Sequence, residues 1–349
     1  MNSSGDHRRG ILAALGAALL FGAGTPLAKW LLDAVSPWLL AGLLYLGSGL
    51  GLTLYRRLIH APAVRLRRNE VAWFACAIVA GGIVGPVLLM IGLTGMPASG
   101  AALLLNAEGV FTTLLAWFVF KENFDRRIAV GMGAIVAGAL VLNWPGEARF
   151  AGLWPTLAVL GACFAWGIDN NLTRNIALAD ATWIASVKGL VSGSVNLCLA
   201  FSLGAAMPAL PNLAGAMAVG LLAYGASLAL FVVGLRHLGT ARTGAYFSVA
   251  PFFGAMLAVL MGEPVTMPLL VAGALMALGA GLHLSERHEH EHAHEAMGHD
   301  HEHVHDEHHQ HAHDVPVAVG TRHHHVHWHK PMIHKHPHFP DAHHRRHTH

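Results

Sequence analysis

Charged residues are scarce in this chain of 349 residues, because Asp, Glu, Lys and Arg together make up only 12% of it. An ordinary soluble domain carries about 25% charged residues. The formal net charge is only +2, and we expect no nucleic-acid partner. The shortage of charge therefore excludes an ordinary soluble domain over most of the sequence.

Cysteine is rarer still. Cys76, Cys163 and Cys198 are the only three, each lies inside an apolar stretch, and none forms a CxxC pair. This pattern is typical of packed core thiols. The apolar stretches also lack a nucleophile motif, a phosphate-binding loop and a pair of metal ligands. We therefore expect a protein that is not an enzyme and that requires no cofactor.

Apolar sequence is abundant instead, with 54% hydrophobic residues and a mean hydropathy of +0.47. A helix that crosses a membrane needs about 20 apolar residues. Ten stretches qualify: 10–32, 36–54, 70–94, 97–119, 127–144, 152–172, 181–203, 213–236, 239–261 and 266–284. Because such long apolar runs exclude an all-β fold, the sequence predicts an all-α integral membrane protein with ten transmembrane helices.

The basic residues of the connections fall on one predicted side of the membrane. They are Arg8, Arg9, Arg56, Arg57, Arg65, Arg67, Arg68, Lys121, Arg126, Arg127, Arg174, Arg236 and Arg242. The connections on the other side contain one basic residue, Arg149. Since cytoplasmic loops are enriched in Lys and Arg, both termini are predicted to be cytoplasmic.

The segment 21–45 is echoed 145 residues later by the segment 166–190. The shift aligns Gly22 with Gly167, Leu27 with Leu172, Lys29 with Arg174 and Trp38 with Trp183. We predict one five-helix repeat at 10–144 and a second at 152–284. Because five is an odd number, the second copy must be inverted in the membrane. Inverted repeats are typical of secondary transporters, whose substrate site lies near the midplane between the repeats.

Short motifs also follow one another in a fixed order. They are Phe21, Gly22, Pro26 and Lys29, then Ser36–Pro37, GVFTTLLAWFVFKE at 109–122, Trp166–Gly167, and APFFGAMLAVLMGE at 250–263. As an ordered set they resemble the EamA-type ten-helix carriers of the drug/metabolite transporter superfamily. The resemblance covers residues 10–284. It implies two inverted repeats around a central cavity, and a carrier in the bacterial inner membrane that moves small solutes, often outward and coupled to protons or solute exchange.

Glu108 stands near the middle of the fourth apolar stretch. Each end of that stretch is roughly 16 Å away at 1.5 Å per residue, too far for the carboxylate to reach water. A charge in the membrane is a functional candidate by default, because burying it is costly. We predict a proton-coupling site or a site for a substrate amine. The alternative is a structural role, as an ion pair with Lys188 or a hydrogen bond inside the bundle.

Asp169, Asn170 and Asn171 form the densest polar group in any apolar stretch. They are predicted to form a polar wall of the solute path, because polar groups in hydrocarbon need partners. Alternatively, they mark the cytoplasmic end of the sixth helix, where water is near. Lys188 is predicted to bind a solute anion or to pair with an acid.

Two more residues complete the candidate solute or coupling site. Asn106 lies two residues before Glu108. Tyr246 is predicted either to line a cavity or to belong to the belt of aromatic residues at the membrane interface. Lys29, near the end of the first apolar stretch, is instead expected to anchor the helix by extending its ammonium group toward water.

Residues 285–349 form a tail rich in histidine, which we predict to be disordered and cytoplasmic. Alternation of His with Asp, Glu and other residues suits Zn, Ni, Co or Cu, through many overlapping weak sites. The alternative is a pH-responsive tail that docks on anionic lipid. The predicted metal ligands are His288, His290, His292, His294, His299, His301, His303, His305, His308, His309, His311 and His313.

The sequence favours a secondary carrier that exports a small organic solute, with the tail as an accessory. A divalent-metal exporter fed by the tail is the alternative, and a membrane-anchored metal-storage protein is the second. The helices hold only scattered acids and no clustered His or Cys, which favours the first. The expected partners are the lipid bilayer, a small solute and divalent metal ions, in a monomer or a homodimer.

Overall fold

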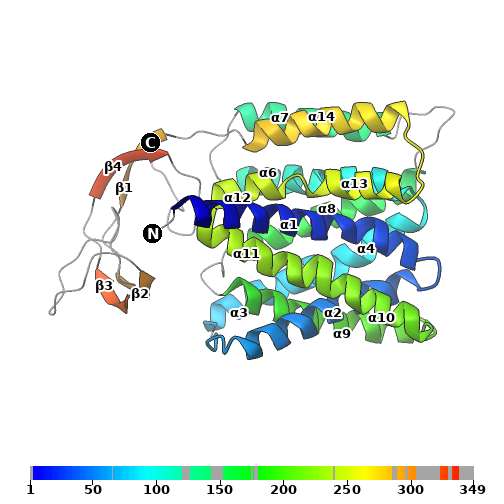
Figure 1. Ribbon diagram of the computed structural model, residues 1–349, viewed down its shortest axis with the longest axis horizontal. Coiled ribbons are helices and arrows are strands. Elements are labelled where there is room, and N and C mark those ends of the chain that lie inside the picture. Colours follow the sequence, from blue (N-terminus) through cyan, green and yellow to red (C-terminus); the bar gives the residue numbers. More distant parts are fainter. Residues whose placement is uncertain are drawn as a thin grey trace. The chain divides into compact units, whose positions relative to one another are not determined.

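The structure is a computed structural model that describes residues 3–64, 66–119, 126–142, 152–173, 176, 180–238, 240–284, 289–294, 298–303, 323–328 and 332–337. The chain divides into two compact units, 1–286 and 287–349. The first unit is a helical body whose helices lie side by side (Figure 1). The second unit contains the short strands of the tail.

Within the described residues, the body contains ten successive helical segments, five in each half. The first half comprises α1 (Ser3–Leu31), α2 (Pro37–Leu58), α3–η1–α4 (Arg68–Ala77, Ile78–Val84, Gly85–Thr94), α5–α6 (Ala98–Leu104, Ala107–Phe118) and α7 (Arg126–Leu142). The second half comprises α8 (Leu153–Thr173), α9 (Ala181–Ser202), α10–η3–α11 (Leu210–Val219, Gly220–Ala226, Ser227–Leu238), α12–α13 (Thr240–Phe247, Ala250–Leu260) and α14 (Met267–Leu284). These segments match the ten predicted stretches to within about four residues at each end, except that α1 begins at Ser3 and not at residue 10.

Seven of the described helices are long and apolar enough to cross a membrane. The helix α8 has 21 residues but is not among the seven. Its C-terminal part carries Asp169, Asn170 and Asn171, which lower its mean hydropathy. The helix α14 contributes a shorter apolar segment, Met267–Leu282.

The third and eighth segments contain π-helical stretches, η1 and η3, where the sequence predicted regular helices. In η1 the cause is visible in the sequence. Pro86 has no N–H, so the carbonyl of Gly82 four residues earlier loses its usual partner. Asn196 of α9 supplies one, because its Nδ2 donates to Gly82 O at 3.1 Å.

The fourth and ninth segments are broken, which corrects the prediction of continuous helices at 97–119 and 239–261. The first break falls at Leu105–Asn106, where Asn106 Nδ2 donates to the carbonyl of Leu103 at 2.8 Å and so competes with the helix backbone. The second break falls at Ser248–Val249. There Pro251 cannot donate to the carbonyl four residues earlier.

Helices of the first five segments pack against helices of the last five. The helix α1 packs against α11 and α13, and α8 packs against α4 and α6. Two further contacts join α2 with α9 and α7 with α14. The α2–α9 pair is close enough that a Cβ on Gly189 would lie 2.7 Å from the Cα of Gly49. Small residues thus let the backbones of α2 and α9 approach closely.

The tail contains four strands in its described residues. β1 (Glu289–His294) pairs antiparallel with β4 (Met332–Pro337), and β2 (Gly298–His303) pairs antiparallel with β3 (His323–Trp328). Disorder of the tail stays a prediction, and these four strands are the segments of it that the structure describes. Alternation with period two, which suits a row of metal ligands, is also the period of a strand.

Candidate functional site

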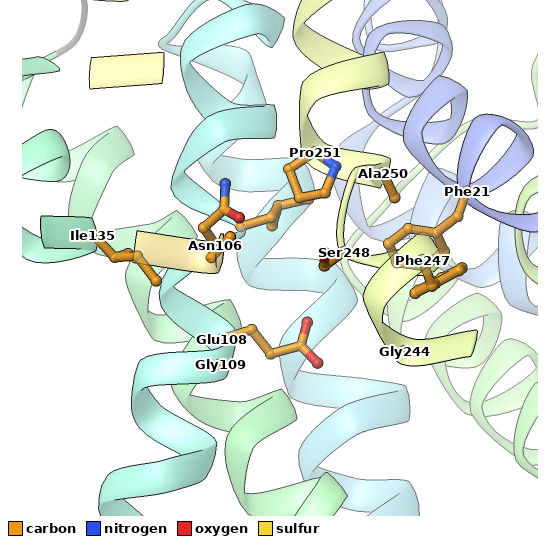
Figure 2. Close-up of a pocket in the computed structure, with 12 residues that line it drawn as sticks. Phe21, Asn106, Glu108, Gly109, Ile135, Gly244, Phe247, Ser248, Ala250 and Pro251 are labelled. Carbon is orange, nitrogen blue, oxygen red and sulfur yellow. The ribbon is translucent and has the colours of Figure 1, made fainter. Parts of the chain in front are cut away.

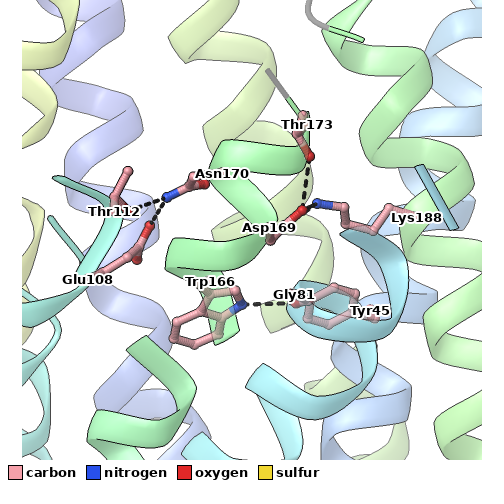
Figure 3. Close-up of polar contacts among 9 residues, drawn as sticks. All are labelled: Tyr45, Gly81, Glu108, Thr112, Trp166, Asp169, Asn170, Thr173 and Lys188. Atoms are coloured by element: carbon pink, nitrogen blue, oxygen red, sulfur yellow. Dashed lines mark hydrogen bonds and ion pairs between the residues drawn. The ribbon is translucent and has the colours of Figure 1, made fainter. Parts of the chain in front are cut away.

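The C-terminal part of α8 places three consecutive polar side chains toward different neighbours. Successive helix residues are rotated by about 100°. Asp169 therefore faces Lys188 on α9, whereas Asn170 reaches α6 (Figure 3). Asn171 also reaches α6, through the carbonyl of Thr112. In the structure these side chains link α8 to two helices of different halves, and a polar wall of the solute path stays a prediction.

Asp169 and Lys188 form an ion pair. Lys188 Nζ lies 2.6 Å from both carboxylate oxygens, and Thr173 Oγ1 donates to Asp169 Oδ1 at 2.9 Å. The side chain of Asp169 retains only 9% of its accessible surface, and that of Lys188 retains 16%. A charge buried to this degree is stable only when it is paired and hydrogen-bonded. Of the two predictions for Lys188, the pairing with an acid is the one that the structure contains.

Glu108 lies in the first turn of α6, beside the helix break, and not in the middle of a continuous helix as predicted. Asn170 Nδ2 donates to Glu108 Oε1 at 2.8 Å and to Thr112 Oγ1 at 3.2 Å. Among the described residues, Glu108 forms no ion pair. The predicted alternative of a Glu108–Lys188 pair is therefore wrong, whereas a hydrogen bond inside the bundle is present.

Glu108 lines a cavity of about 300 Å³, which we name cavity A (Figure 2). Asn106 lines the same cavity, as predicted for a site residue. The opposite side is formed by the broken segment α12–α13, including Phe247 and Pro251. A Cβ on Gly109 would meet no atom within 4 Å, so this part of the cavity has free space.

A second cavity of about 310 Å³, cavity B, lies against Asp169, Asn170 and Lys188. Its other walls include Tyr45 of α2 and Tyr224 of η3, whose ring centroids are 5.8 Å apart. Asn170 lines cavity B while its amide holds Glu108 of cavity A. Asn170 therefore forms a hydrogen bond between a wall of cavity B and a wall of cavity A.

The carbonyl of Gly81 in η1 anchors two aromatic side chains near cavity B. Tyr45 Oη donates to it at 2.8 Å, and Trp166 Nε1 donates at 2.9 Å (Figure 3). A Cβ on Gly81 would overlap the carboxylate of Asp169, so only glycine fits here. The π-helical segment thus holds the walls of the cavity in place.

Two predicted site residues lie elsewhere. Asn171 is buried and donates to Thr112 O at 3.0 Å and Gly167 O at 2.9 Å, so it joins α8 to α6. Tyr246 is not among the residues that line cavities A and B, because the next residue, Phe247, takes that position. Sequence reasoning missed Tyr45, Tyr224 and Phe247. A phenol group inside an apolar helix, which needs a partner, was the available signal for the two tyrosines.

Lys29 has a different role from the predicted anchor. Its Nζ donates to the carbonyl of Leu93 at 2.5 Å and to that of Thr94 at 3.5 Å. These are free carbonyls in the last turn of α4. Lys29 therefore caps a neighbouring helix.

Half of the predicted metal ligands lie in the described strands of the tail, where only the backbone is described, and the other half lie outside the described residues. Those on strands are His290, His292, His294, His299, His301 and His303; those outside are His288, His305, His308, His309, His311 and His313. Within the described residues of the helical body, no group of three or more His, Cys, Asp or Glu is placed to hold a metal ion. The metal site of the tail stays a prediction.

Comparison with known proteins gives consistent results. The model of the EamA-like transporter family matches residues 8–144. A protein of Methanothermobacter thermautotrophicus described as an uncharacterized transporter is 26% identical over 290 residues, which are 77% of this chain and 84% of the relative. An uncharacterized inner membrane transporter of Escherichia coli K12 is 24% identical over 237 residues, 65% of this chain and 74% of its own.

Two further similarities are narrower. A "Probable amino-acid metabolite efflux pump" of Salmonella typhimurium is 35% identical over 86 residues, 24% of this chain and 28% of that protein. A solved crystal structure has a TM-score of 0.59 at 18% identity and covers 78% of this chain and 94% of its own. That likeness supports the fold alone.

Proposed function

Because this chain belongs to the EamA-like transporter family of the drug/metabolite transporter superfamily, we propose that it exports a small organic solute by alternating access. It is a multi-pass membrane transporter and not an enzyme. The small solute and the lipid bilayer are its implied partners. Amino acids and related metabolites are the first solutes to test, since the Salmonella relative is named for them.

The observation that carries the proposal is the contrast between the two carboxylates. Asp169 is neutralised by Lys188, whereas Glu108 lines a cavity and receives a neutral amide hydrogen bond from Asn170. Among the described residues, Glu108 is thus the cavity carboxylate that still lacks a cation. A solute amine or a proton would supply that positive charge. Glu108 is therefore the proposed substrate or coupling group.

We also propose that the halves are inverted repeats, at 10–144 and 152–284. The order of elements supports this, because π-helical stretches fall in the third segment of each half and breaks fall in the fourth. The contacts of α1 with α11 and α13 correspond to those of α8 with α4 and α6. Such a relation lets one half rock against the other around a central site.

The proposed location is the bacterial inner membrane, with both termini in the cytoplasm. Basic residues at the ends of the described helices support this orientation: Arg56 and Arg57 end α2, and Arg68 begins α3. Cytoplasmic connections are enriched in such residues. The E. coli relative is described as an inner membrane transporter.

The tail is proposed as an accessory that binds Zn, Ni, Co or Cu. The unit 287–349 is separate from the unit that contains cavities A and B. The absence of a metal-binding group among the described body residues disfavours a metal exporter relative to a solute carrier.

The oligomeric state, monomer or homodimer, stays part of the proposal.

Transport into everted membrane vesicles tests the proposal. Uptake of radiolabelled amino acids, aromatic amines and Ni²⁺ is compared with and without a proton gradient. We expect gradient-dependent uptake of an organic solute that Glu108→Gln abolishes. The matched control is Glu70→Gln, which removes a carboxylate at the exposed start of α3. Uptake of Ni²⁺ alone, or unchanged gradient dependence in Glu108→Gln, would contradict the assignment.

A further inference from the structure

Phe21 of α1 and Phe247 of α12 line both cavities. Their ring centroids are 5.4 Å apart, with the planes inclined by 51°. Figure 2 shows the two rings together at one edge of cavity A. A pair of side chains that belongs to both cavities, and whose members touch, forms part of the wall between them.

Neighbouring aromatic rings hold this pair on both sides. Phe21 also contacts Tyr224, with centroids 5.9 Å apart and planes at 89°, and Phe247 contacts Phe231 at 4.9 Å and 66°. Edge-to-face contacts of this kind stabilise aromatic pairs beyond the area that they bury. The neighbouring rings therefore hold Phe21 and Phe247 in place.

Each side of the wall has its own carboxylate. Cavity A contains Glu108 and cavity B contains Asp169 with Lys188. The Asn170–Glu108 hydrogen bond is the polar link between the two sides. A solute that passes from one carboxylate to the other must therefore pass the Phe21–Phe247 pair, next to the Asn170–Glu108 hydrogen bond.

The volumes indicate what the wall restricts. Pockets that bind small molecules enclose about 300–1,000 Å³. Each cavity, at about 300 and 310 Å³, lies at the lower limit of that range, whereas both together would lie well inside it. The wall thus separates a site for small solutes from a site for much larger ones.

The position of Phe247 allows it to move. It is the last residue of α12, directly before the break at Ser248–Val249. One turn earlier, a Cβ on Gly244 would meet no atom within 4 Å, which leaves room beside the helix. Breaks of this kind absorb changes in backbone angles when a segment moves.

The geometry points to the Phe21–Phe247 pair as a movable partition that sets the upper size of the solute. In its closed position each cavity accepts only a small molecule. Displacement of Phe247 joins the cavities and lets the solute pass from the Glu108 side to the Asp169 side. The inference rests on the proposed carrier function for its role, but the size limit itself can be measured without a known solute.

Cysteine labelling measures that limit. Ser48, which lines cavity B, is replaced by Cys in a chain where the exposed Cys76 and Cys198 are changed to Ser. Purified protein is treated with methanethiosulfonate ethylammonium, which is small, or with a bulky biotin-bearing methanethiosulfonate. We expect Phe247→Ala to raise the ratio of the bulky to the small labelling rate about tenfold, because loss of the ring joins the cavities and makes room for the bulky reagent at position 48. A tenfold change corresponds to a barrier lower by about 1.4 kcal/mol.

Two variants serve as references. Phe164→Ala removes a ring that packs on Phe111 and lines neither cavity, so the ratio should stay unchanged. Phe247→Trp should lower the ratio. An unchanged ratio in Phe247→Ala, with the parent's elution profile and melting temperature, would overturn the partition. If Phe247→Ala does not fold, Phe247→Leu and Phe21→Leu provide the same readout.

The labelling result and the transport result fail separately. If the vesicles take up no organic solute but the labelling ratio rises in Phe247→Ala, the partition stands and the carrier proposal falls. If solute uptake depends on Glu108 but the labelling ratio does not change, the carrier proposal stands and the partition is wrong.

Discussion

Lys188 Nζ lies 2.6 Å from each carboxylate oxygen of Asp169, and this contact joins α9 to the C-terminal part of α8. It decides how the charges of the membrane region are distributed. Because Lys188 is taken up by Asp169, it is not available to Glu108 in cavity A. The ion pair therefore leaves one carboxylate for the solute or the proton.

The first prediction concerns this ion pair. Lys188→Gln should destabilise the protein by about 3–5 kcal/mol, because it leaves the Asp169 carboxylate buried without its partner. The double variant Asp169→Asn/Lys188→Gln should recover most of that loss, since no buried charge remains. Thermal unfolding in detergent gives the order of the melting temperatures, with the exposed Arg57→Gln as control. Additive losses in the double variant would contradict the coupling.

The second prediction concerns the carbonyl of Gly81. Tyr45→Phe and Trp166→Phe each remove one of its two hydrogen bonds. Each should cost about 1 kcal/mol, and the double variant should cost more than the sum, because only then does the carbonyl lose both side-chain donors. Melting temperatures of the four proteins test this. The control variant Tyr55→Phe, at an exposed tyrosine, should have no effect. If the stability lost in the double variant equals the sum of the two single losses, the two side chains do not share one acceptor.

The third prediction concerns pH. Asp180 precedes α9, and its side chain accepts from the N–H groups of Thr182 and Trp183 and pairs with Arg56 Nη1 at 2.7 Å. Partial burial opposes the charged form, but the hydrogen bonds from Thr182 and Trp183, together with Arg56, outweigh it and hold the pKa of Asp180 below its usual value. Its contribution to stability is present above the unfolded-state pKa, about 3.9. It is lost as the pH falls through the lower folded-state pKa.

Two variants separate the helix cap from the ion pair at Asp180. Asp180→Asn keeps a capping oxygen and loses the charge, so it should cost about 1 kcal/mol at neutral pH. Asp180→Ala loses both and should cost about 2 kcal/mol. Melting curves measured from pH 7 down to strongly acidic buffer should converge for the parent and Asp180→Asn. A constant difference at all pH values would show that the carboxylate does not titrate as described.

The sequence predicts the ten helical segments well because apolar length is a local property. It does not predict the breaks, since these depend on competition at single residues such as Asn106 and Pro251. Nor does it identify the partner of Lys188, because that depends on whether α8 turns Asp169 toward α9 or α6 turns Glu108 toward it. The aromatic residues of the cavities were missed for a related reason. In an apolar helix, Phe21 and Phe247 look the same as any ring that faces lipid.

The last prediction concerns the tail. Removal of residues 287–349 should leave the melting temperature of the helical body unchanged, because these residues form a separate compact unit. Uptake of an organic solute into vesicles should continue, whereas binding of Zn²⁺ or Ni²⁺, measured by equilibrium dialysis, should be lost. A full-length variant with the twelve histidines between 288 and 313 changed to Asn separates loss of ligands from loss of the chain. If this variant binds metal as well as the parent does, the ligands lie elsewhere. If solute uptake disappears in both variants while the body remains folded, the tail is part of the transport mechanism and not an accessory.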